Sequence, residues 1–204
     1  KADCHGCNGC SDCCHGMGNS VVLDPFDVYR LQQGLEMPFV QLLQQGTVAL
    51  NVVDGCILPN LTMGGKAEAC AFLGADGRCT IHASRPAVCR LFPLGRYYEN
   101  GDFRYILQIG ECTAKNRSKI KVSKWIDTPD CARNHAFVCE WHALRKQLER
   151  EVTGQEDSGR AKTLNMGFLQ LFFLREYDVT ADFYAQFYER LQEFKGSFMG
   201  EPGE

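Results

Sequence analysis

The pattern of apolar and polar residues divides the chain into two parts of different character. In the first part, up to about residue 125, apolar residues come in short runs that are separated by turn sequences. Beyond that point they recur every three or four residues, which is the spacing of one helix face. We therefore predict two units, a cysteine-cluster unit over residues 1–125 and a helical C-terminal extension over residues 126–204.

Cap and turn residues predict the elements of the first unit. Asp24-Pro25 is a helix cap followed by a first-turn proline, which predicts a helix to about Gly34. A second short helix is expected between Pro38 and Gly46. Asp-Gly and Asn-Gly pairs are strong hairpin signals, and they predict three hairpins, with their turns at residues 54–55, 76–77 and 100–101.

The second unit is predicted to be helical throughout. Thr128-Pro129-Asp130 predicts the start of a helix that runs through Leu148. Residues 153–160 are predicted to be a linker, and an apolar helix is predicted over residues 161–175. A last helix opens at residues 180–182, and a loose tail is expected over residues 196–204. An apolar stripe marks that last helix, for which we favour core packing over a dimer contact: Phe183, Phe187, Leu191 and Phe194.

Composition narrows the range of functions. Hydrophobic residues make up 45% of the 204 residues, which is enough for a true core, so the cysteines are not needed to rescue a chain without one. The formal net charge of -3 argues against nucleic-acid binding. The longest apolar run, residues 164–174, is too short to cross a membrane, which takes about 20 residues. A basic run after residue 114 fits an acidic partner, nucleic acid or, as we favour, a solvated edge strand.

Twelve cysteines are the outstanding feature of the chain. No basic-then-apolar leader is visible, so we expect a reducing cytoplasm, where dense cysteines bind metal rather than form disulfides. Residues 1–18 are rich in glycine and cysteine and have almost no apolar side chains. Such a segment cannot pack a core, and bound metal is the obvious means of ordering it.

The cysteines fall into two groups along the chain. Cys7, Cys10 and Cys13 are spaced by two residues, as in loops that wrap an iron–sulfur cluster, and as in zinc sites. Cys14 follows directly, and we expect it to serve another site or to be a core thiol, because adjacent residues rarely point at one corner. The second group is separated by longer loops and consists of Cys70, Cys79, Cys89 and Cys112.

These residues carry a resemblance to a known family. The runs CNGCSDCC (7–14) and CAFLGADGRCTIHASRPAVCRLFPLG (70–95) resemble the YkgJ-like cysteine-cluster family, whose signature is CxxCxxCC and which is described as a putative zinc- or iron-chelating domain. The resemblance covers about residues 4–125 and implies metal chelation. One branch of similar proteins is linked to lysine methylation of flagellin, but no glycine-rich methyl-donor motif is visible here, so that activity is not carried over.

Two metals fit the cysteine set. Three cysteines at two-residue spacing in a glycine-rich loop favour one [4Fe-4S] cluster, while the vicinal pair and the hairpin-borne Cys70 and Cys79 favour zinc. We place the iron–sulfur cluster first. The sequence supplies the set of ligands but not their pairing, and our first choice for the cluster is Cys7, Cys10, Cys13 and Cys89, with Cys14, Cys70, Cys79 and Cys112 as the second tier.

Other polar residues near the cysteines have two interpretations each. Arg85 and Arg90 either donate to cluster sulfurs, which tunes a cofactor, or form ordinary salt bridges, and we weigh these equally. His5, His15 and His82 are expected to be solvated or hydrogen-bonded, with His15 the best candidate for a ligand. The cysteines outside the two groups that we expect to be small buried hydrophobes are Cys56, Cys131 and Cys139.

Three functions follow as hypotheses. The first is a redox or cluster-carrying module that serves a protein client. The second is a cluster-dependent enzyme, in which an open iron corner binds a substrate or S-adenosylmethionine in a pocket lined by Arg90, Arg96 or Tyr97. The third is a structural zinc domain that meets an unknown protein partner. The fold class expected for all three is α+β, with a small, metal-stapled core of short hairpins and helices and a helical C-terminal part.

Overall fold

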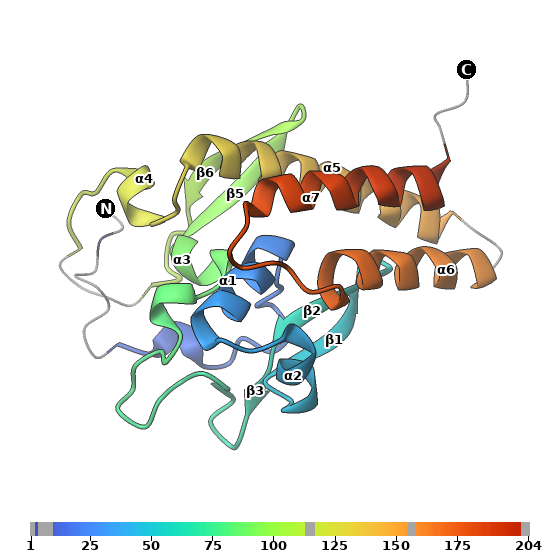
Figure 1. Cartoon of the computed structure of the whole chain (residues 1–204). Helices are drawn as coiled ribbons and strands as arrows, with labels where there is room; N and C mark the ends of the chain where they lie inside the picture. Colours follow the sequence, from blue (N-terminus) through green and yellow to red (C-terminus); the bar gives the residue numbers. More distant parts are fainter. Residues whose placement is uncertain (1–2, 4–9, 113–116, 155–157, 201–204) are drawn as a thin grey trace.

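The computed structural model confirms the α+β architecture, with small two-stranded antiparallel hairpins and long helices (Figure 1). It describes residue 3 and residues 10–112, 117–154 and 158–200. Among them, no helix is both long and apolar enough to cross a membrane.

The N-terminal elements follow the predicted caps. The short 3-10 helix η1 spans Asp12–Cys14, α1 spans Pro25–Leu35 and α2 spans Phe39–Gln44. Asp24 caps α1 in a capping box, in which its side chain accepts from the Asp27 N–H at 2.8 Å. α1 ends at Leu35, one residue beyond Gly34. A Cβ at Gly34 would clash with the Ser84 Oγ. Glycine at this position lets α1 approach the 3-10 helix η2 (His82–Ser84).

Two of the three predicted hairpins are confirmed. β1 (Val48–Val53) pairs with β2 (Cys56–Leu61), and β5 (Leu94–Glu99) pairs with β6 (Asp102–Leu107). Both turns have positive φ at each central residue, as Asp-Gly and Asn-Gly allow. The third prediction was wrong in part: residues 76–77 form a turn, but its flanks are joined by the isolated bridge Leu73↔Cys79 and do not form strands.

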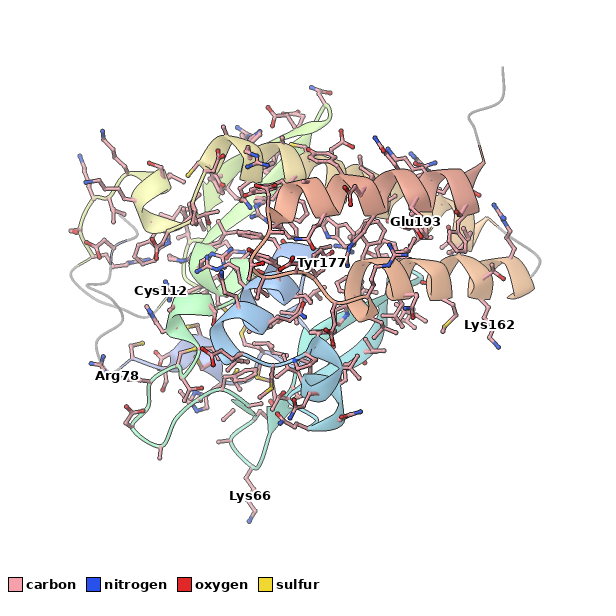
Figure 2. The ribbon with its side chains drawn as sticks, in the orientation of Figure 1. Lys66, Arg78, Cys112, Lys162, Tyr177 and Glu193 are labelled. Carbon is pink, nitrogen blue, oxygen red and sulfur yellow. The ribbon has the colours of Figure 1, made fainter. Side chains whose placement is uncertain are left out.

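A hairpin that the sequence did not predict lies just before this turn in the chain. β3 (Met63–Gly64) and β4 (Ala69–Cys70) pair over two residues each, with Met63 opposite Cys70. Figure 2 shows Lys66 projecting into solvent from the tip of this hairpin. The segment that follows is mostly loop up to the five-residue helix α3 (Ala87–Leu91).

The helical part begins with α4 (Val122–Trp125) and the long α5 (Cys131–Thr153). The expected edge strand in the basic run is not seen among residues 117–125, which hold a single bridge at Ser118 and then α4. Lys115 lies outside the described residues. α6 (Ser158–Leu169) continues as the π-helical turn η3 (Gln170–Leu174), and α7 (Phe183–Phe194) continues as η4 (Lys195–Met199).

The loose tail expected from residue 196 was wrong for residues 196–199. The ring of Phe198 stacks on Phe194, with centroids 5.2 Å apart, and a Cβ at Gly167 would come within 2.5 Å of the same ring. Packing of this one aromatic side chain against α6 and α7 holds the turn in place.

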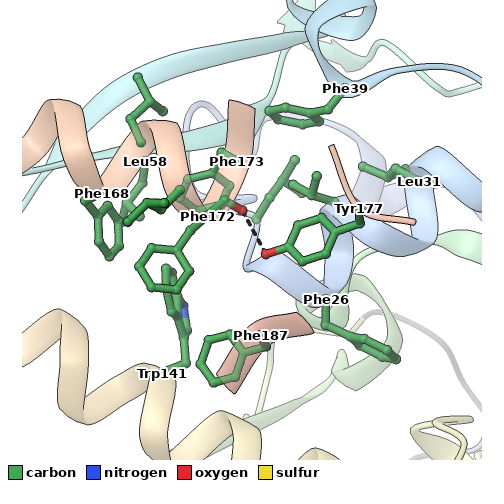
Figure 3. Packing of buried hydrophobic residues seen from close by; sticks show 14 of the residues in the cluster. Phe26, Leu31, Phe39, Leu58, Trp141, Phe168, Phe172, Phe173, Tyr177 and Phe187 are labelled. Atoms are coloured by element: carbon green, nitrogen blue, oxygen red, sulfur yellow. Dashed lines mark hydrogen bonds between the residues drawn. The ribbon is translucent and has the colours of Figure 1, made fainter. Parts of the chain in front are cut away.

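Aromatic side chains from both parts of the chain form the core (Figure 3). Phe26 of α1 lies 5.0 Å from Phe183 of α7, centroid to centroid, and Trp141 of α5 stacks on Phe168 of α6 at 5.1 Å. The predicted stripe of α7 faces this core, with all four side chains buried. Buried residues on both sides of residue 125 therefore belong to one hydrophobic cluster, while the predicted division at that residue stays a prediction.

Buried polar groups tie the two parts together. Asn165 of α6 accepts from the Ile57 N–H at 2.8 Å and donates to the Gly55 carbonyl at 3.0 Å, which fixes α6 on the β1–β2 hairpin. At the end of η3, Arg190 donates to the carbonyls of Leu171 and Arg175, and the Tyr177 hydroxyl donates to the Phe172 carbonyl (Figure 3). These bonds satisfy carbonyls that a helix end leaves without partners.

Candidate metal centre

Five cysteines line one small cavity in the N-terminal part. Its volume is about 70 Å³, and four elements supply its thiols: Cys13 and Cys14 of η1, Cys70 of β4, Cys79 of the following loop, and Cys89 of α3. The remaining wall is apolar apart from one cation, Arg85, and consists of Met17, Val21, Leu61, Met63, Ile81, Pro86, Val88 and Phe92.

Backbone hydrogen bonds bring η1 and β4 together. The Gly16 N–H donates to the Glu68 carbonyl at 2.9 Å, and His15 forms an isolated bridge with Ala69. Cys13 and Cys14, which directly precede this bridge, are thereby placed beside Cys70, more than fifty residues away in sequence. A contact of this kind cannot be read from cysteine spacing.

The loop and α3 close the other side of the cavity. The Thr80 N–H donates to the Phe72 carbonyl at 2.9 Å, which folds the loop back so that Cys79 lies near Cys70. The N-terminus of α3 is fixed on α1, because the Ala87 N–H donates to the Asp27 Oδ1 at 2.7 Å. Cys89 is two residues further along α3 and lines the cavity.

The thiols of Cys13 and Cys14 share a hydrogen bond, and their acidities diverge. The pKa of Cys13 is lowered to about 6, chiefly because the Cys14 thiol donates to it, with the Arg85 guanidinium as a smaller cause. The pKa of Cys14 is raised by the same bond and by burial. The pair therefore holds one proton at neutral pH, with the negative charge on Cys13. Cys14, which we expected at another site or as a core thiol, lines the same cavity as Cys13.

The other three thiols are held in their neutral form. Burial raises the pKa of Cys89 to about 12 and also raises the pKa values of Cys70 and Cys79. Charge on Cys13 acts in the same direction on all three, which places the four sulfurs within electrostatic reach of one another. A metal bound here would have to displace their protons.

The spacing of these sulfurs bears on the kind of metal group. One zinc ion with Zn–S bonds of about 2.3 Å holds its tetrahedral sulfurs about 3.8 Å apart. Within the described part of the chain, no three cavity sulfurs all lie within 4.8 Å of one another. An iron–sulfur cubane binds each thiolate to a different iron, so its ligands are more widely spread. The all-thiolate donor chemistry of the cavity fits either metal group.

The two arginines of the RPxxCR segment have different surroundings. Arg85 lines the cavity and helps to lower the pKa of Cys13. Arg90 is buried on the other side of α3, where it pairs with Asp27 at 3.9 Å and donates to the Arg85 carbonyl at 2.5 Å. Of the two interpretations we weighed, Arg90 therefore takes the structural one, while Arg85 faces the sulfurs.

Not every predicted ligand reaches this cavity. Cys7 lies outside the described residues, as do Cys4 and His5. Cys10 and Cys112 are half-buried but do not line the cavity, and Figure 2 shows Cys112 on the side of the molecule where α3 also lies. Of the histidines considered as ligands, the two that the structure describes do not line it: His15 bonds the Ser11 carbonyl through Nδ1 at 2.9 Å, and His82 lies at the start of η2.

The cysteines outside the two groups differ from one another. Cys56 is buried, as expected, and its pKa is raised to about 11 by burial. Cys131 is exposed, so the expectation of a buried hydrophobe was wrong; its thiol donates to the Thr128 carbonyl at 3.3 Å, at the exposed first turn of α5. Cys139 is half-buried and lies beside His135, a residue that sequence reasoning passed over. Their four-residue spacing on a predicted helix was the available signal.

A second cavity, of about 280 Å³, lies on the opposite side of α3. Val88 and Phe92 line both cavities, so α3 is the wall between them. The polar lining of the second cavity includes Arg96, Arg145, Asp24 and Gln108. Of the three residues expected beside a substrate pocket, Arg96 lines this cavity, and Arg90 and Tyr97 do not.

Comparison with known proteins agrees with the cysteine geometry. Residues 6–106 match the family model CxxCxxCC, described as a putative zinc- or iron-chelating domain. No curated protein and no solved structure matches the chain. The matched segment contains all five cysteines of the cavity and every element that positions them. Through residues 6–106, the chain therefore belongs to the CxxCxxCC family of zinc- or iron-chelating domains.

Proposed function

We propose that the protein binds one iron–sulfur cluster, of the [4Fe-4S] type, in the cysteine cavity and serves as a redox or cluster-carrying module in a reducing cytoplasm. The ligands proposed are Cys13, Cys70, Cys79 and Cys89, one from each of the four elements around the cavity. The observation that carries the proposal is the largely apolar cavity to which these four elements, far apart in the sequence, each bring a thiol.

The surroundings suit such a group. An apolar wall keeps water away from bound sulfur, and burial and nearby charge are what set the potential of a cluster. Arg85 is the one cation of the lining and offsets part of the negative charge of four thiolates. When bound, the cluster would supply a one-electron couple. Cys14 would then be a fifth thiol in the wall, hydrogen-bonded to its neighbour.

This ligand set differs from the one suggested by spacing alone, which combined Cys7, Cys10, Cys13 and Cys89. Cys10 does not line the cavity, whereas Cys70 and Cys79 do. We propose that Cys10 and Cys112, which do not line the cavity, either hold a second metal or exchange metal with it.

The test is the metal and sulfide content of protein purified without oxygen, together with its visible spectrum. We expect about four irons and four sulfides per chain, and loss of the chromophore in C13S, C70S, C79S and C89S. The matched controls C56S and C131S should keep it, because neither thiol lines the cavity. Colourless protein with zinc and no sulfide would replace this proposal by a structural zinc domain.

One observation favours the second candidate, a cluster-dependent enzyme. The 280 Å³ cavity shares the wall of α3 with the cysteine cavity and offers two arginines for an anionic group. If a substrate or S-adenosylmethionine binds there, adding it at saturation should change the cluster's spectrum, and R96Q should abolish that change. An unchanged spectrum would remove this candidate and leave the redox module.

A further inference from the structure

Three donor side chains meet on the surface between the β5–β6 hairpin and α5, well away from the cysteine cavity lining. They are Asp102, the first residue of β6, and His135 and Cys139, one turn apart on α5. The His135 Nε2 lies 2.6 Å from the Asp102 Oδ1, and the Cys139 Sγ lies 3.7 Å from the same oxygen. Within the described residues, this is the one group of three or more such donors whose ligand atoms all lie within 4.8 Å of one another.

The three side chains are held in place by their surroundings. The His135 ring stacks on Phe103, with centroids 4.4 Å apart and planes 22° apart. The Asp102 Oδ1 also accepts from the Phe103 N–H at 2.7 Å, and Asp102 is fixed in register opposite Glu99. Cys139 packs against the core at the base of the group. The donors therefore sit on a helix and a strand, which position ligands better than loops do.

The donor chemistry selects a class of ion. Imidazole nitrogen, thiolate sulfur and carboxylate oxygen together suit Zn²⁺ and related divalent transition metals, whereas Ca²⁺ and Mg²⁺ prefer oxygen alone. An aspartate and a thiolate would neutralise the double charge of the ion. Burial, Asp102 and Glu140 raise the pKa of the Cys139 thiol and Arg96 lowers it by less, so a bound ion would have to displace its proton. Asp102 and His135 have side chains 68% and 43% exposed, which leaves an open path from solvent.

We propose that Asp102, His135 and Cys139 bind a single Zn²⁺ ion at a second metal site, independent of the cysteine cavity. Three protein ligands leave a fourth position for water, and the Cys139 thiol gives up its proton to solvent when the metal binds. Metal–ligand distances of about 2.0–2.3 Å require Asp102 and His135 to move apart slightly from their present hydrogen bond. The ion would link the β5–β6 hairpin, in the CxxCxxCC segment, to the long helix α5.

Zinc titration of the full-length, iron-loaded protein tests the proposal, with zinc and iron counted after removal of free metal. We expect one equivalent of Zn²⁺ per chain with no loss of iron, and binding weakened at least about 100-fold, that is by roughly 2.7 kcal/mol, in H135Q and C139S. D102N keeps an oxygen for the Phe103 N–H and should weaken binding less. The matched controls on the same helix, H142Q and C131S, should bind as the unaltered protein does.

Two outcomes would overturn the site. If H135Q and C139S bind as much zinc as the unaltered protein and with equal affinity, the ion lies elsewhere. If the unaltered protein binds no zinc beyond the metal of the cavity, Asp102, His135 and Cys139 form hydrogen bonds only. Circular dichroism of each variant guards against loss of fold. Failure of the cluster proposal would be seen separately, as absence of iron and sulfide, and leaves this titration interpretable on the zinc-loaded protein.

Discussion

The aromatic core and the cysteine cavity are built on opposite principles. In the core, long helices bury whole rings, and Phe168, Phe172, Phe187 and Phe194 have no exposed surface. Around the cavity, the elements are two to five residues long and are joined by a few backbone hydrogen bonds. The core therefore holds its shape by apolar burial, whereas the cavity walls depend on the core behind them and on what the thiols bind.

The largest effect is expected from emptying the core. Phe172 lies 5.4 Å from Trp141 and 5.7 Å from Phe194, centroid to centroid, and F172A should cost about 4 kcal/mol of unfolding free energy. M166A, on the same run of helix but 48% exposed, should cost less than about 1 kcal/mol. Urea unfolding measures both values. Equal costs for the two variants would contradict the packing described here.

The next largest effect should come from the joint between the two regions. Asp27 is buried in α1, pairs with Arg90 and accepts from the Ala87 N–H of α3. D27A leaves the buried Arg90 charge without its partner and should cost about 3 kcal/mol. Because α3 carries Cys89, metal affinity should fall as well.

The matched variant D27N separates the two roles of this side chain. It keeps an oxygen for the Ala87 N–H but loses the charge, so it should keep more of the metal affinity than of the stability. Urea unfolding and metal titration on both variants make the comparison. A D27A protein with unchanged stability and unchanged metal affinity would show that α1 does not position the cavity.

Removing the metal should distinguish the two regions directly. Hydrogen exchange of the metal-free protein should be at least about tenfold faster in η1, in β3–β4 and in the loop before α3. Exchange in α5, α6 and α7 should stay close to that of the loaded protein, because their protection comes from ring packing. Uniform loss of protection along the chain would mean that the metal supports the whole fold.

The same contrast explains how much could be predicted from the sequence. Asn100-Gly101 and Asp54-Gly55 gave correct hairpins, because a tight turn with positive φ is a local requirement. Asp76-Gly77 has the same signal, but the segment after this turn does not extend as a strand. The Thr80 N–H donates to the Phe72 carbonyl, and Cys79 lines the cavity. The α7 stripe was predictable because period 3.6 reports burial directly.

The membership of the cavity was only partly predictable. All five of its cysteines stand in the family motif, but their grouping depends on the pairing of His15 with Ala69, which no local pattern encodes. For Cys14 we expected another site or a core thiol, because adjacent side chains usually diverge, and the tight η1 turn brings the thiols of Cys13 and Cys14 to one cavity. Arg85 and Arg90 could not be told apart, because the buried partner of Arg90 comes from a helix sixty residues earlier.

Metal binding to the cavity should release a defined number of protons. Cys13, with its pKa near 6, is already ionised at pH 7.5, whereas the pKa values of Cys70, Cys79 and Cys89 are raised and their thiols are neutral. Loading the metal-free protein with Zn²⁺ as a probe should release about three protons, and log affinity should rise with pH at a slope of about three. A weakly buffered indicator assay measures the protons, with H135Q used to silence the surface site. A count near zero would mean that the cavity thiols are not the ligands.

The smallest effect concerns the one thiolate of the metal-free cavity. A hydrogen bond from Cys14 is the main cause of the lowered pKa of Cys13, and Arg85 is a lesser one. C14A should therefore raise the pKa of Cys13 towards its ordinary range of about 8.5, and R85Q should raise it by less. At pH 7 about 90% of Cys13 is ionised with a pKa of 6.

The alkylation of Cys13 by iodoacetamide, followed by mass spectrometry, should slow by roughly tenfold in C14A, since only the thiolate reacts. C131S, which changes an exposed thiol on α5, should leave that rate unchanged. A Cys13 that reacts equally fast in C14A would assign the lowered pKa to Arg85, in which case R85Q would show the larger loss.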